Sequence, residues 1–396
     1  MSVNLRRKND KPILWIMTAP NYAAAGIKPR YELLDGLRGV AAFAVIWYHF
    51  FEGFATSPTD QWMNHGYLAV DFFYVLSGFV IGYAYDDRWR DGGMTAGRFM
   101  LRRVIRLQPM VVLSVVLGLV AFLVQGSVRW DGSAVPVGMV LLSLFMALFL
   151  IPVFPGMGAD VRGNGEMFPL NGPSWSLFFE YIGSILYAVV LHRLSRKALA
   201  CVTAVSGAGL AIMAVGDFSG AYHLGMGWSM GGWGFLGGFL RLSFSFSVGL
   251  LMARGLRPVH VRGAFWICGA LILAVLACPY IGVGHGPSVF NGIYDTFCTL
   301  AVFPAIVYMG ASGATTDIMS TRICGFLGRL SYPVYIIHYP VMYLFYAWVW
   351  NNGLSFARVW PVCVALLVLI TAMAWAALRF YDEPVRNALS HRWLGR

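Results

Sequence analysis

The stretch Leu33–Phe50, LLDGLRGVAAFAVIWYHF, decides the fold, because it is an apolar segment of membrane length that carries two ionisable side chains. Arg38 lies near its start and His49 near its end. In a helix their spacing corresponds to about 1100° of rotation and ~16 Å of rise. This rotation is within roughly 20° of three full turns, so both side chains lie on one face. An ionisable group inside a membrane span is costly and by default indicates a functional site. The structural alternatives are that Arg38 reaches the lipid headgroups and that His49 is a hydrogen-bonded packing residue.

The composition is that of a polytopic membrane protein. Hydrophobic residues make up 58% of the 396 residues and charged residues only 12%, and the mean hydropathy is +0.66. The net charge of +11 is explained by Lys and Arg held on the cytoplasmic side, so we expect no nucleic-acid partner. The six cysteines are scattered without a CxxC pair, which predicts neither a metal site nor a disulfide framework.

Eleven apolar segments are long enough to span a bilayer, and the positive charges decide how many of them cross. The basic stretches 86–106 and 192–197 both belong on the cytoplasmic side, which leaves one net crossing between residues 107 and 173. Prolines bound and interrupt the segment 136–155 in this region, as in a re-entrant or broken helix. The segments are 37–54, 66–85, 109–126, 136–155, 174–192, 198–215, 233–253, 263–283, 291–311, 331–350 and 359–380.

The sequence therefore predicts an all-α transmembrane helical bundle with about ten net spans and one extra re-entrant or broken helix. Both termini are expected in the cytoplasm, and an eleven-span topology is the alternative. We expect a basic N-terminal tail over residues 1–30, a membrane domain over 31–386 and a cytoplasmic C-terminal tail over 387–396.

Three polar side chains are expected at a similar depth in the outer half of the bilayer. His49 lies about five residues, or ~7 Å, from the outer end of its span. Asp71 and Glu180 lie five to six residues from the outer starts of theirs. A carboxylate beside a histidine orients the ring and strengthens it as a general base, and we expect Glu180, before Asp71, in that role. A structural cap or ion pair is the alternative for each carboxylate.

Basic residues near the cytoplasmic side predict a phosphate site. Arg103 and Arg106 are three residues apart and share a helix face, and guanidinium groups suit phosphates of a lipid or a nucleotide-bearing cofactor. A positive-inside anchor is the alternative. Arg241 lies within an apolar span and must face the interior, while Ser331 and His338 share one face of a later span.

The order of motifs resembles the acyltransferase type 3 family, bacterial inner-membrane enzymes that O-acylate O-antigen, exopolysaccharide, Nod factor and some macrolides. The resemblance runs from about Tyr31 to Arg386. It depends on LDGLRGVAAFAVIWYH, VDFFYVLSGFVIG, RFMLRRVIRLQP, PSWSLFFEY, GRLSYPVYIIHYPV and YDEPVR. The chain departs from the family at Tyr181, where a second acidic residue is frequent, and at Val385, where an aromatic residue is frequent.

The resemblance implies roles for individual residues. The basic residue and the histidine of the family's first motif correspond to Arg38 and His49, and the resemblance implies that His49 is the catalytic residue. It also implies that Arg103 and Arg106 bind acyl-CoA. Further matches to its motifs are Trp175, Ser176, Leu177 and Glu180, then Ser331, Tyr332, Tyr335, His338 and Pro340.

The expected function is transfer of an acyl group, most simply acetyl from acetyl-CoA, to a hydroxyl of an extracytoplasmic acceptor. His49 would act as base, supported by Glu180 or Asp71, and Arg38 would lie along the pantetheine path. The expected partners are acyl-CoA, a glycan, glycolipid or macrolide acceptor, and membrane lipid in the bacterial inner membrane. No metal is expected, and we expect no SGNH-type hydrolase domain, of the kind fused to some members, within these 396 residues.

Two other functions fit part of the sequence. A proton-coupled transporter or exporter of a glycolipid or organic acid would use the same buried histidine and carboxylates as a proton relay. No internal repeat is visible, which weighs against that alternative. A scaffold without activity is a third alternative, which the pair of Arg38 and His49 disfavours.

Overall fold

The computed structural model describes residues 31–255, 259, 261–282, 284–313 and 318–395, which belong to one compact unit. The predicted basic tail, residues 1–30, lies outside the described residues. Within the described part, regular structure is helical apart from two isolated backbone bridges, one of which pairs Glu166 with Ser229. The predicted all-α class is confirmed.

The helices follow one another in the order expected from the apolar segments. They are α1 (Glu32–Glu52), η2 (His65–Leu68), α2 (Ala69–Arg90), α3 (Ala96–Val124), α4 (Val137–Leu148), α5 (Ser174–Val189), η3 (Leu191–Arg193), α6 (Arg196–Val215), α7 (Gly234–Gly255), α8 (Ala264–Leu276), α9 (Val289–Phe297), η4 (Cys298–Val302), α10 (Phe303–Ser312), α11 (Ile318–Asn351), α12 (Phe356–Ala377), η5 (Leu378–Asp382) and α13 (Glu383–Leu394).

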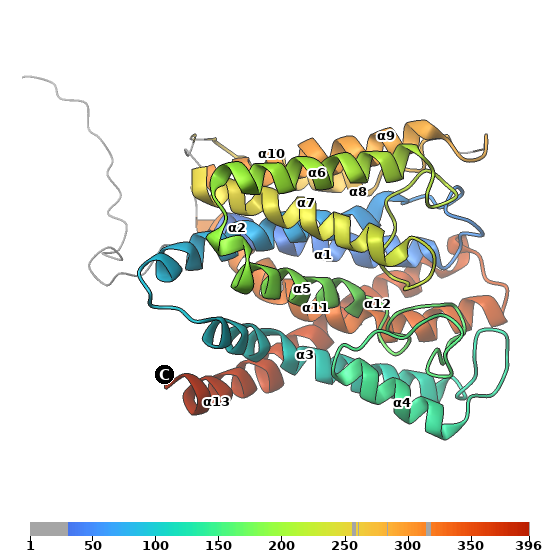
Figure 1. Ribbon diagram of the computed structural model, residues 1–396. Coiled ribbons are helices and arrows are strands. Elements are labelled where there is room, and N and C mark those ends of the chain that lie inside the picture. The colour runs from blue at the N-terminus through green and yellow to red at the C-terminus, as the bar shows by residue number, and fades with distance from the viewer. Residues whose placement is uncertain (1–30, 256–258, 260, 283, 314–317, 396) are drawn as a thin grey trace, which may run out of the picture. The chain divides into compact units, whose positions relative to one another are not determined.

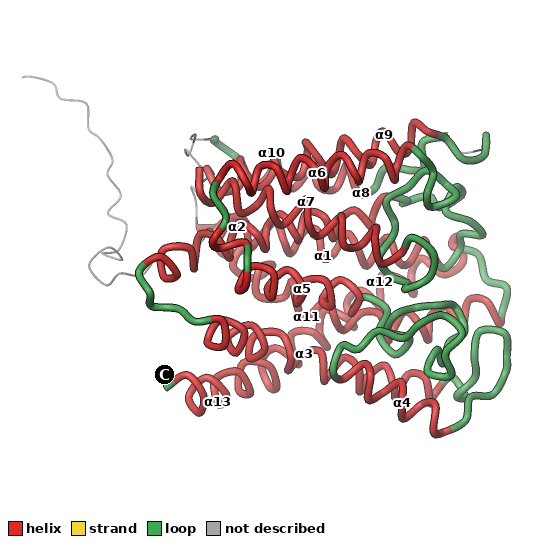
Figure 2. Tube along the Cα trace, in the orientation of Figure 1, coloured by secondary structure: helices red, strands yellow, loops and turns green. Residues whose placement is uncertain are grey.

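The long helices lie side by side and define two faces (Figure 1). At the basic face α1 and α11 begin and α2 ends, next to the exposed Arg88, Arg90 and Arg98. At the loop face α1 and α11 end, and the irregular segments 53–64, 125–136, 149–173 and 216–233 gather there (Figure 2). The residues of the loop face therefore come from distant parts of the sequence.

Within the residues that the structure describes, six helical segments are long and apolar enough to cross a membrane, and the chain is a multi-pass membrane protein. They are 65–90, 96–124, 196–215, 234–255, 289–312 and 356–394. Helices α1, α5, α8 and α11 lie in the same bundle (Figure 1). The more polar α1 and α11 lie against each other within it, where their ionisable side chains avoid lipid.

Helix α4 is the predicted extra helix and falls short of a full crossing. Its twelve residues rise ~18 Å, against a hydrocarbon thickness of about 30 Å. It begins near the loop face, and segment 149–173 returns to that face before α5 begins (Figure 1). The side-chain amide of Gln108 on α3 donates to the Leu148 carbonyl at 2.7 Å. This bond satisfies one of the free carbonyl groups at the C-terminal end of α4. The stretch from 107 to 173 thus contains one helix long enough to cross a membrane, which is α3, and one short apolar helix, which is α4.

Close approach of helices depends on small residues in α1 and α2. A Cβ atom added at Gly39 of α1 would lie 2.6 Å from the carbonyl oxygen of Leu327 in α11. A Cβ atom added at Gly78 of α2 would lie 2.1 Å from the carbonyl oxygen of Phe246 in α7. Helices in a membrane gain little from the hydrophobic effect, so such backbone contact supplies much of their association. The α1–α11 and α2–α7 pairs therefore form the packed centre of the bundle.

Candidate active site

His49 lies in the last turn of α1 and has a carboxylate partner on the same helix. Its Nδ1 lies 2.7 Å from Oε2 of Glu52, one turn further on. The Tyr346 hydroxyl of α11 donates to the same Glu52 oxygen at 2.9 Å and lies 2.8 Å from the His49 carbonyl oxygen. A carboxylate on Nδ1 fixes the imidazole and leaves Nε2 for a substrate proton. This is the arrangement that a general base requires.

The imidazole ring of His49 is held between aromatic rings of α11. It stacks on His338, with ring centroids 5.2 Å apart and planes inclined by 29°, and meets Tyr339 edge-on at 4.8 Å. His338 is fully buried, and its Nδ1 lies 3.2 Å from the Val334 carbonyl oxygen. The structure therefore brings the sequence-predicted His338 next to His49, as a packing partner of its ring.

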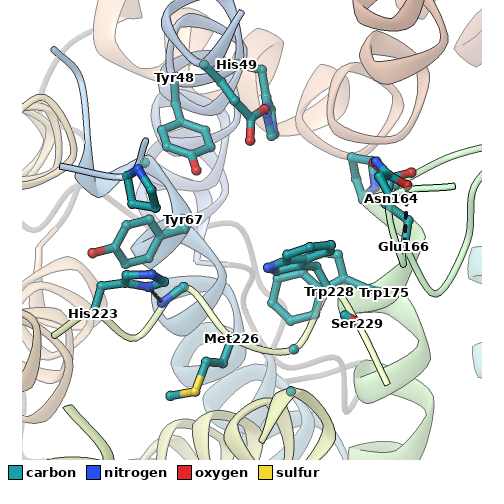
Figure 3. Close-up of a pocket in the computed structure, with 18 of the residues that line it drawn as sticks. Tyr48, His49, Tyr67, Asn164, Glu166, Trp175, His223, Met226, Trp228 and Ser229 are labelled. Atoms are coloured by element: carbon teal, nitrogen blue, oxygen red, sulfur yellow. Dashed lines mark hydrogen bonds and ion pairs between the residues drawn. The ribbon is translucent and has the colours of Figure 1, made fainter. Parts of the chain in front are cut away.

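His49 faces a cavity of about 730 Å³ among the loops of the loop face, here called the loop-face cavity. Figure 3 shows His49 and Tyr48 entering it from one side, with Asn164 and Glu166 on another. Its walls are rich in aromatic rings, which include Tyr48, Tyr67, Trp175, Trp228, Tyr339 and Tyr343. A space of this size and lining suits a small organic ligand or one unit of a larger one.

Two titratable side chains of the loops also line this cavity. Burial raises the pKa of Glu166 to about 7, although hydrogen bonds from Tyr343 and Asn164 oppose that rise. Burial likewise lowers the pKa of His223 to about 4, and its Nδ1 accepts a hydrogen bond from the Gly225 amide at 2.9 Å. At neutral pH His223 is therefore uncharged, and Glu166 is close to its midpoint of ionisation.

Asp71 does not contact His49 and instead forms a buried ion pair with Arg241. The Arg241 guanidinium donates to both Asp71 carboxylate oxygens at 2.6 to 3.1 Å, and both side chains are fully buried. It also donates to the carbonyls of Met226 at 2.8 Å and Tyr67 at 2.7 Å, and it lies 5.4 Å from the Trp175 ring. The prediction that Asp71 supports His49 is therefore wrong. The ion pair of Arg241 and Asp71 instead stabilises the loops that form the wall of the cavity.

Glu180 likewise has a different partner from the one expected. It accepts hydrogen bonds from Arg103 and from the Ser77 hydroxyl, the latter at 3.3 Å. Arg103 also donates to the Ser184 hydroxyl at 3.2 Å. The expected support of His49 by Glu180 is therefore wrong as well. The carboxylate on His49 is Glu52, which the sequence reasoning missed although it lies three residues away on the same helix.

The sequence-predicted arginines meet at a second, smaller cavity of about 100 Å³, here called the arginine cavity. Arg38, Arg103 and Arg106 line it together with Glu180 and Ser331. Arg38 donates to the Ser331 hydroxyl at 3.1 Å and pairs with Asp35, one turn earlier. Arg106 is exposed, and no ion pair in the described part of the chain involves it. Its guanidinium is thus available to an anionic ligand.

The two cavities share lining residues. Val70 of α2 and Tyr335 of α11 line both, and the Tyr335 hydroxyl lies 2.8 Å from Oγ of Ser176 on α5. Arg38 and His49, on one face of α1 as predicted, thus lie in adjoining cavities. A flexible ligand held by the arginines would point along α1 toward His49.

A metal centre finds no support in the described residues. They contain no group of three or more His, Cys, Asp or Glu side chains placed to hold a metal ion. The polar groups at the two cavities are instead a histidine–carboxylate pair and a set of arginines, which suit acid–base chemistry and anion binding.

Comparison with known proteins gives several relatives. The chain is 34% identical over 194 residues to "Protein 2 in picA locus" of Rhizobium radiobacter, which covers 47% of this chain and 95% of that protein. It is 26% identical over 387 residues to the "O-acetyltransferase OatA" of Staphylococcus aureus, which covers 91% of this chain and 58% of that protein. A "Putative O-acetyltransferase" of the same organism is 23% identical over 381 residues, 89% of this chain and 57% of that protein. The chain thus spans less than two thirds of the two O-acetyltransferases. No solved structure matches it.

The family comparison covers most of the membrane domain. The family described as "Acyltransferase domain" matches residues 31–379, a range that contains both cavities and every candidate site residue named above. The chain belongs to the acyltransferase 3 family of membrane proteins.

Proposed function

We propose that this protein is an O-acyltransferase that moves an acyl group from acyl-CoA, bound at the arginine cavity, to a hydroxyl group in the loop-face cavity. The observation that carries the proposal is the histidine–carboxylate pair of His49 and Glu52, which faces the larger cavity and adjoins a cavity lined by three arginines. Acetyl is the simplest donor group, since two relatives are named O-acetyltransferases.

The arginine cavity supports the donor end of this proposal. Arg106 is exposed and unpaired within the described chain, and guanidinium groups bind phosphate oxygens through paired, charge-assisted hydrogen bonds. With the phosphates of acyl-CoA at Arg106, the pantetheine arm would extend past Arg38 and between Val70 and Tyr335. The thioester would then lie next to His49.

The chemistry at His49 is general-base catalysis. Nε2 of His49 takes the proton of the acceptor hydroxyl, whose oxygen attacks the thioester carbonyl carbon. The tetrahedral intermediate collapses with loss of the CoA thiolate, which takes the proton from the imidazolium. Glu52 stabilises the positive charge that the ring carries between these steps. Direct transfer needs no covalent acyl-enzyme.

The proposed orientation places the basic face in the cytoplasm, because exposed arginines concentrate there. CoA is supplied from that side, and the acceptor, a glycan, glycolipid or macrolide, would be reached from the loop face. A proton-coupled transporter is disfavoured by membership of an acyltransferase family.

The test is acyl transfer in inverted membrane vesicles that receive radiolabelled acetyl-CoA. We expect the wild type to label a lumenal glycan or glycolipid and His49→Ala to lower the rate by about 10²–10⁴, the usual contribution of a general base. His391→Ala, which removes an exposed histidine of α13, is the matched control. Equal labelling by His49→Ala and the control would remove His49 from the chemistry. With no label from acetyl-CoA, a series of longer acyl-CoAs decides whether any acyl group is transferred.

A further inference from the structure

One wall of the loop-face cavity has no role in the mechanism above. It consists of Asn164 and Glu166 from segment 149–173 and Trp130 from segment 125–136. The Glu166 backbone forms a bridge with Ser229, and the Met167 amide donates to the Trp228 carbonyl at 2.8 Å. This wall is therefore joined to segment 216–233, and its side chains have a defined position relative to His49 (Figure 3).

Glu166 is oriented by hydrogen bonds and lacks an ion pair within the described chain. Its carboxylate accepts from the Tyr343 hydroxyl at 2.5 Å and from the Asn164 amide at 3.0 Å. The neighbouring Arg162 donates to the carbonyl of Pro169 at 2.7 Å and to the side chain of Gln125 at 2.8 Å, and its guanidinium lies 3.3 Å from the centroid of the Tyr343 ring. Each carboxylate oxygen can accept a second hydrogen bond, so Glu166 can also bind a ligand hydroxyl.

The charges that face the cavity are mainly acidic. Arg241 is its one lining arginine among the described residues, and Asp71 neutralises it. His223 is uncharged at neutral pH, as described above. Glu52 and Glu166 are therefore the carboxylates that line the cavity among the described residues, and an acceptor beside His49 meets both of them.

The remaining lining favours a sugar ring. Aromatic faces carry partial negative charge, so they attract the C–H groups of a pyranose, which carry partial positive charge. Trp130, Trp175 and Trp228 all line the cavity, and Trp228 is 44% exposed. A bound sugar can thus stack on an indole while its hydroxyls reach Asn164, Glu166 and His49.

From this arrangement we infer that Glu166 determines acceptor specificity: it binds a hydroxyl of an uncharged sugar next to Trp130 and Asn164, and it repels sugars that carry a carboxylate or phosphate. The inference rests on the proposed function, since it treats the loop-face cavity as the acceptor site. It adds a residue and a charge preference that the mechanism alone does not supply.

The pH dependence of this selection follows from the surroundings of Glu166. Burial is the main reason for its raised pKa, and the groups facing it are Tyr343 and Tyr339 of α11, Glu52 of α1, and Asn164 and Arg162 of its own segment. Above about pH 7 the carboxylate is ionised and repels an anionic sugar. Well below pH 7 it is neutral, and the discrimination weakens.

The test measures sugar binding by saturation-transfer NMR to the full chain in lipid nanodiscs. The probes are methyl β-glucopyranoside and methyl β-glucuronide, which differ by one carboxylate. We expect the wild type at pH 8.5 to bind the glucoside about tenfold more tightly than the glucuronide, and at pH 5.5 less than about threefold more tightly. Glu166→Gln removes the negative charge that repels the glucuronide. In this variant the preference for the glucoside at pH 8.5 should therefore fall to about threefold or less.

Two further variants make the result decisive. Asn164→Ala removes an exposed side chain that donates to Glu166, and it should weaken glucoside binding about threefold, the loss of one modest hydrogen bond. Asp131→Asn changes an exposed acid that does not line the cavity and should leave both probes unchanged.

Three results would overturn the inference: no glucoside binding by the wild type, tighter binding of the glucuronide, or an unchanged ratio in Glu166→Gln. Because NMR binding needs no acyl transfer, its failure is separable from failure of the proposed function. A protein that selects the glucoside but transfers no acyl group in vesicles would contradict only the proposed function.

Discussion

The hydroxyl of Tyr335 lies 2.8 Å from Oγ of Ser176, at the point where the arginine cavity and the loop-face cavity share lining residues. Tyr335 is largely buried, and its ring meets Phe73 of α2 edge-on at 5.5 Å. The side chain therefore limits the passage between the proposed donor and acceptor sites. Substitution of Tyr335 therefore tests how the protein selects the length of the acyl chain.

Tyr335→Ala is expected to relax the choice of acyl chain. Removing the ring opens space next to the position of the thioester. Each methylene group added to the acyl chain then makes favourable contacts worth about 1 kcal/mol or more, where the wild-type ring would clash with it. We expect the ratio of butyryl to acetyl transfer to rise about tenfold in Tyr335→Ala. Rates with acetyl-, butyryl- and hexanoyl-CoA measure it. Tyr335→Phe keeps the ring and should retain the wild-type preference, so a changed preference there would contradict a steric role.

Glu52→Gln is expected to slow acyl transfer while donor binding remains. The amide preserves the side-chain shape but removes the negative charge that stabilises protonated His49. A loss of about 10- to 10³-fold in kcat is expected, with KM for acyl-CoA changed less than about threefold, since a general base contributes 10²–10⁴ in all. Steady-state kinetics on the variant and on Asp131→Asn, which alters an exposed loop carboxylate outside the cavity, measure both constants. Unaltered kcat in Glu52→Gln would exclude this carboxylate from the mechanism.

Breaking the Asp71–Arg241 pair is expected to destabilise the protein strongly. Asp71→Asn leaves a fully buried guanidinium without its counter-ion, which typically costs about 3–5 kcal/mol. The double variant Asp71→Leu/Arg241→Met removes both charges, and we expect it to recover more than half of that loss. Thermal unfolding of both variants in one detergent measures the difference. If Asp71→Asn melts with the wild type, the pair does not hold the cavity walls.

Ionisation of Glu166 is expected to make the fold less stable as the pH rises. Its pKa is about 7 in the folded protein and 4.5 as its ordinary value, so between these values the folded state binds more protons than the unfolded state. Stability therefore falls from about pH 4.5 to about pH 7, by up to ~3 kcal/mol for this group. Glu166→Gln should remove this part of the pH dependence, measured as the difference between the two unfolding curves at each pH. Parallel curves for wild type and variant would contradict it.

The sequence alone was sufficient to predict which residues share a helix face. Arg38 and His49 lie along one side of α1 because the 3.6-residue period fixes their rotation about the axis. The prolines of segment 136–155 indicated an interrupted helix, and α4 has only twelve residues. The basic residues 103 and 106 were likewise placed together, at one cavity with Arg38.

The pairing of side chains between helices could not be predicted in the same way. Asp71 and Glu180 were expected near His49 because their depth in the bilayer was similar, but depth does not fix the direction in which a side chain leaves its helix. Asp71 faces Arg241 of α7 and Glu180 faces Arg103 of α3. The contribution of Glu166 depends on the path of an irregular segment, for which the sequence offers no periodicity.

The most direct test of the central claim is the sidedness of transfer in proteoliposomes whose protein orientation is known from protease accessibility. Labelled acetyl-CoA is supplied at one face, and an impermeant glycan or glycolipid acceptor at the other. We predict acylated acceptor when acetyl-CoA meets the basic face and the acceptor meets the loop face, and no product in the reverse arrangement. Product formed only when acetyl-CoA meets the loop face would contradict a donor site at the arginines and an acceptor site at His49.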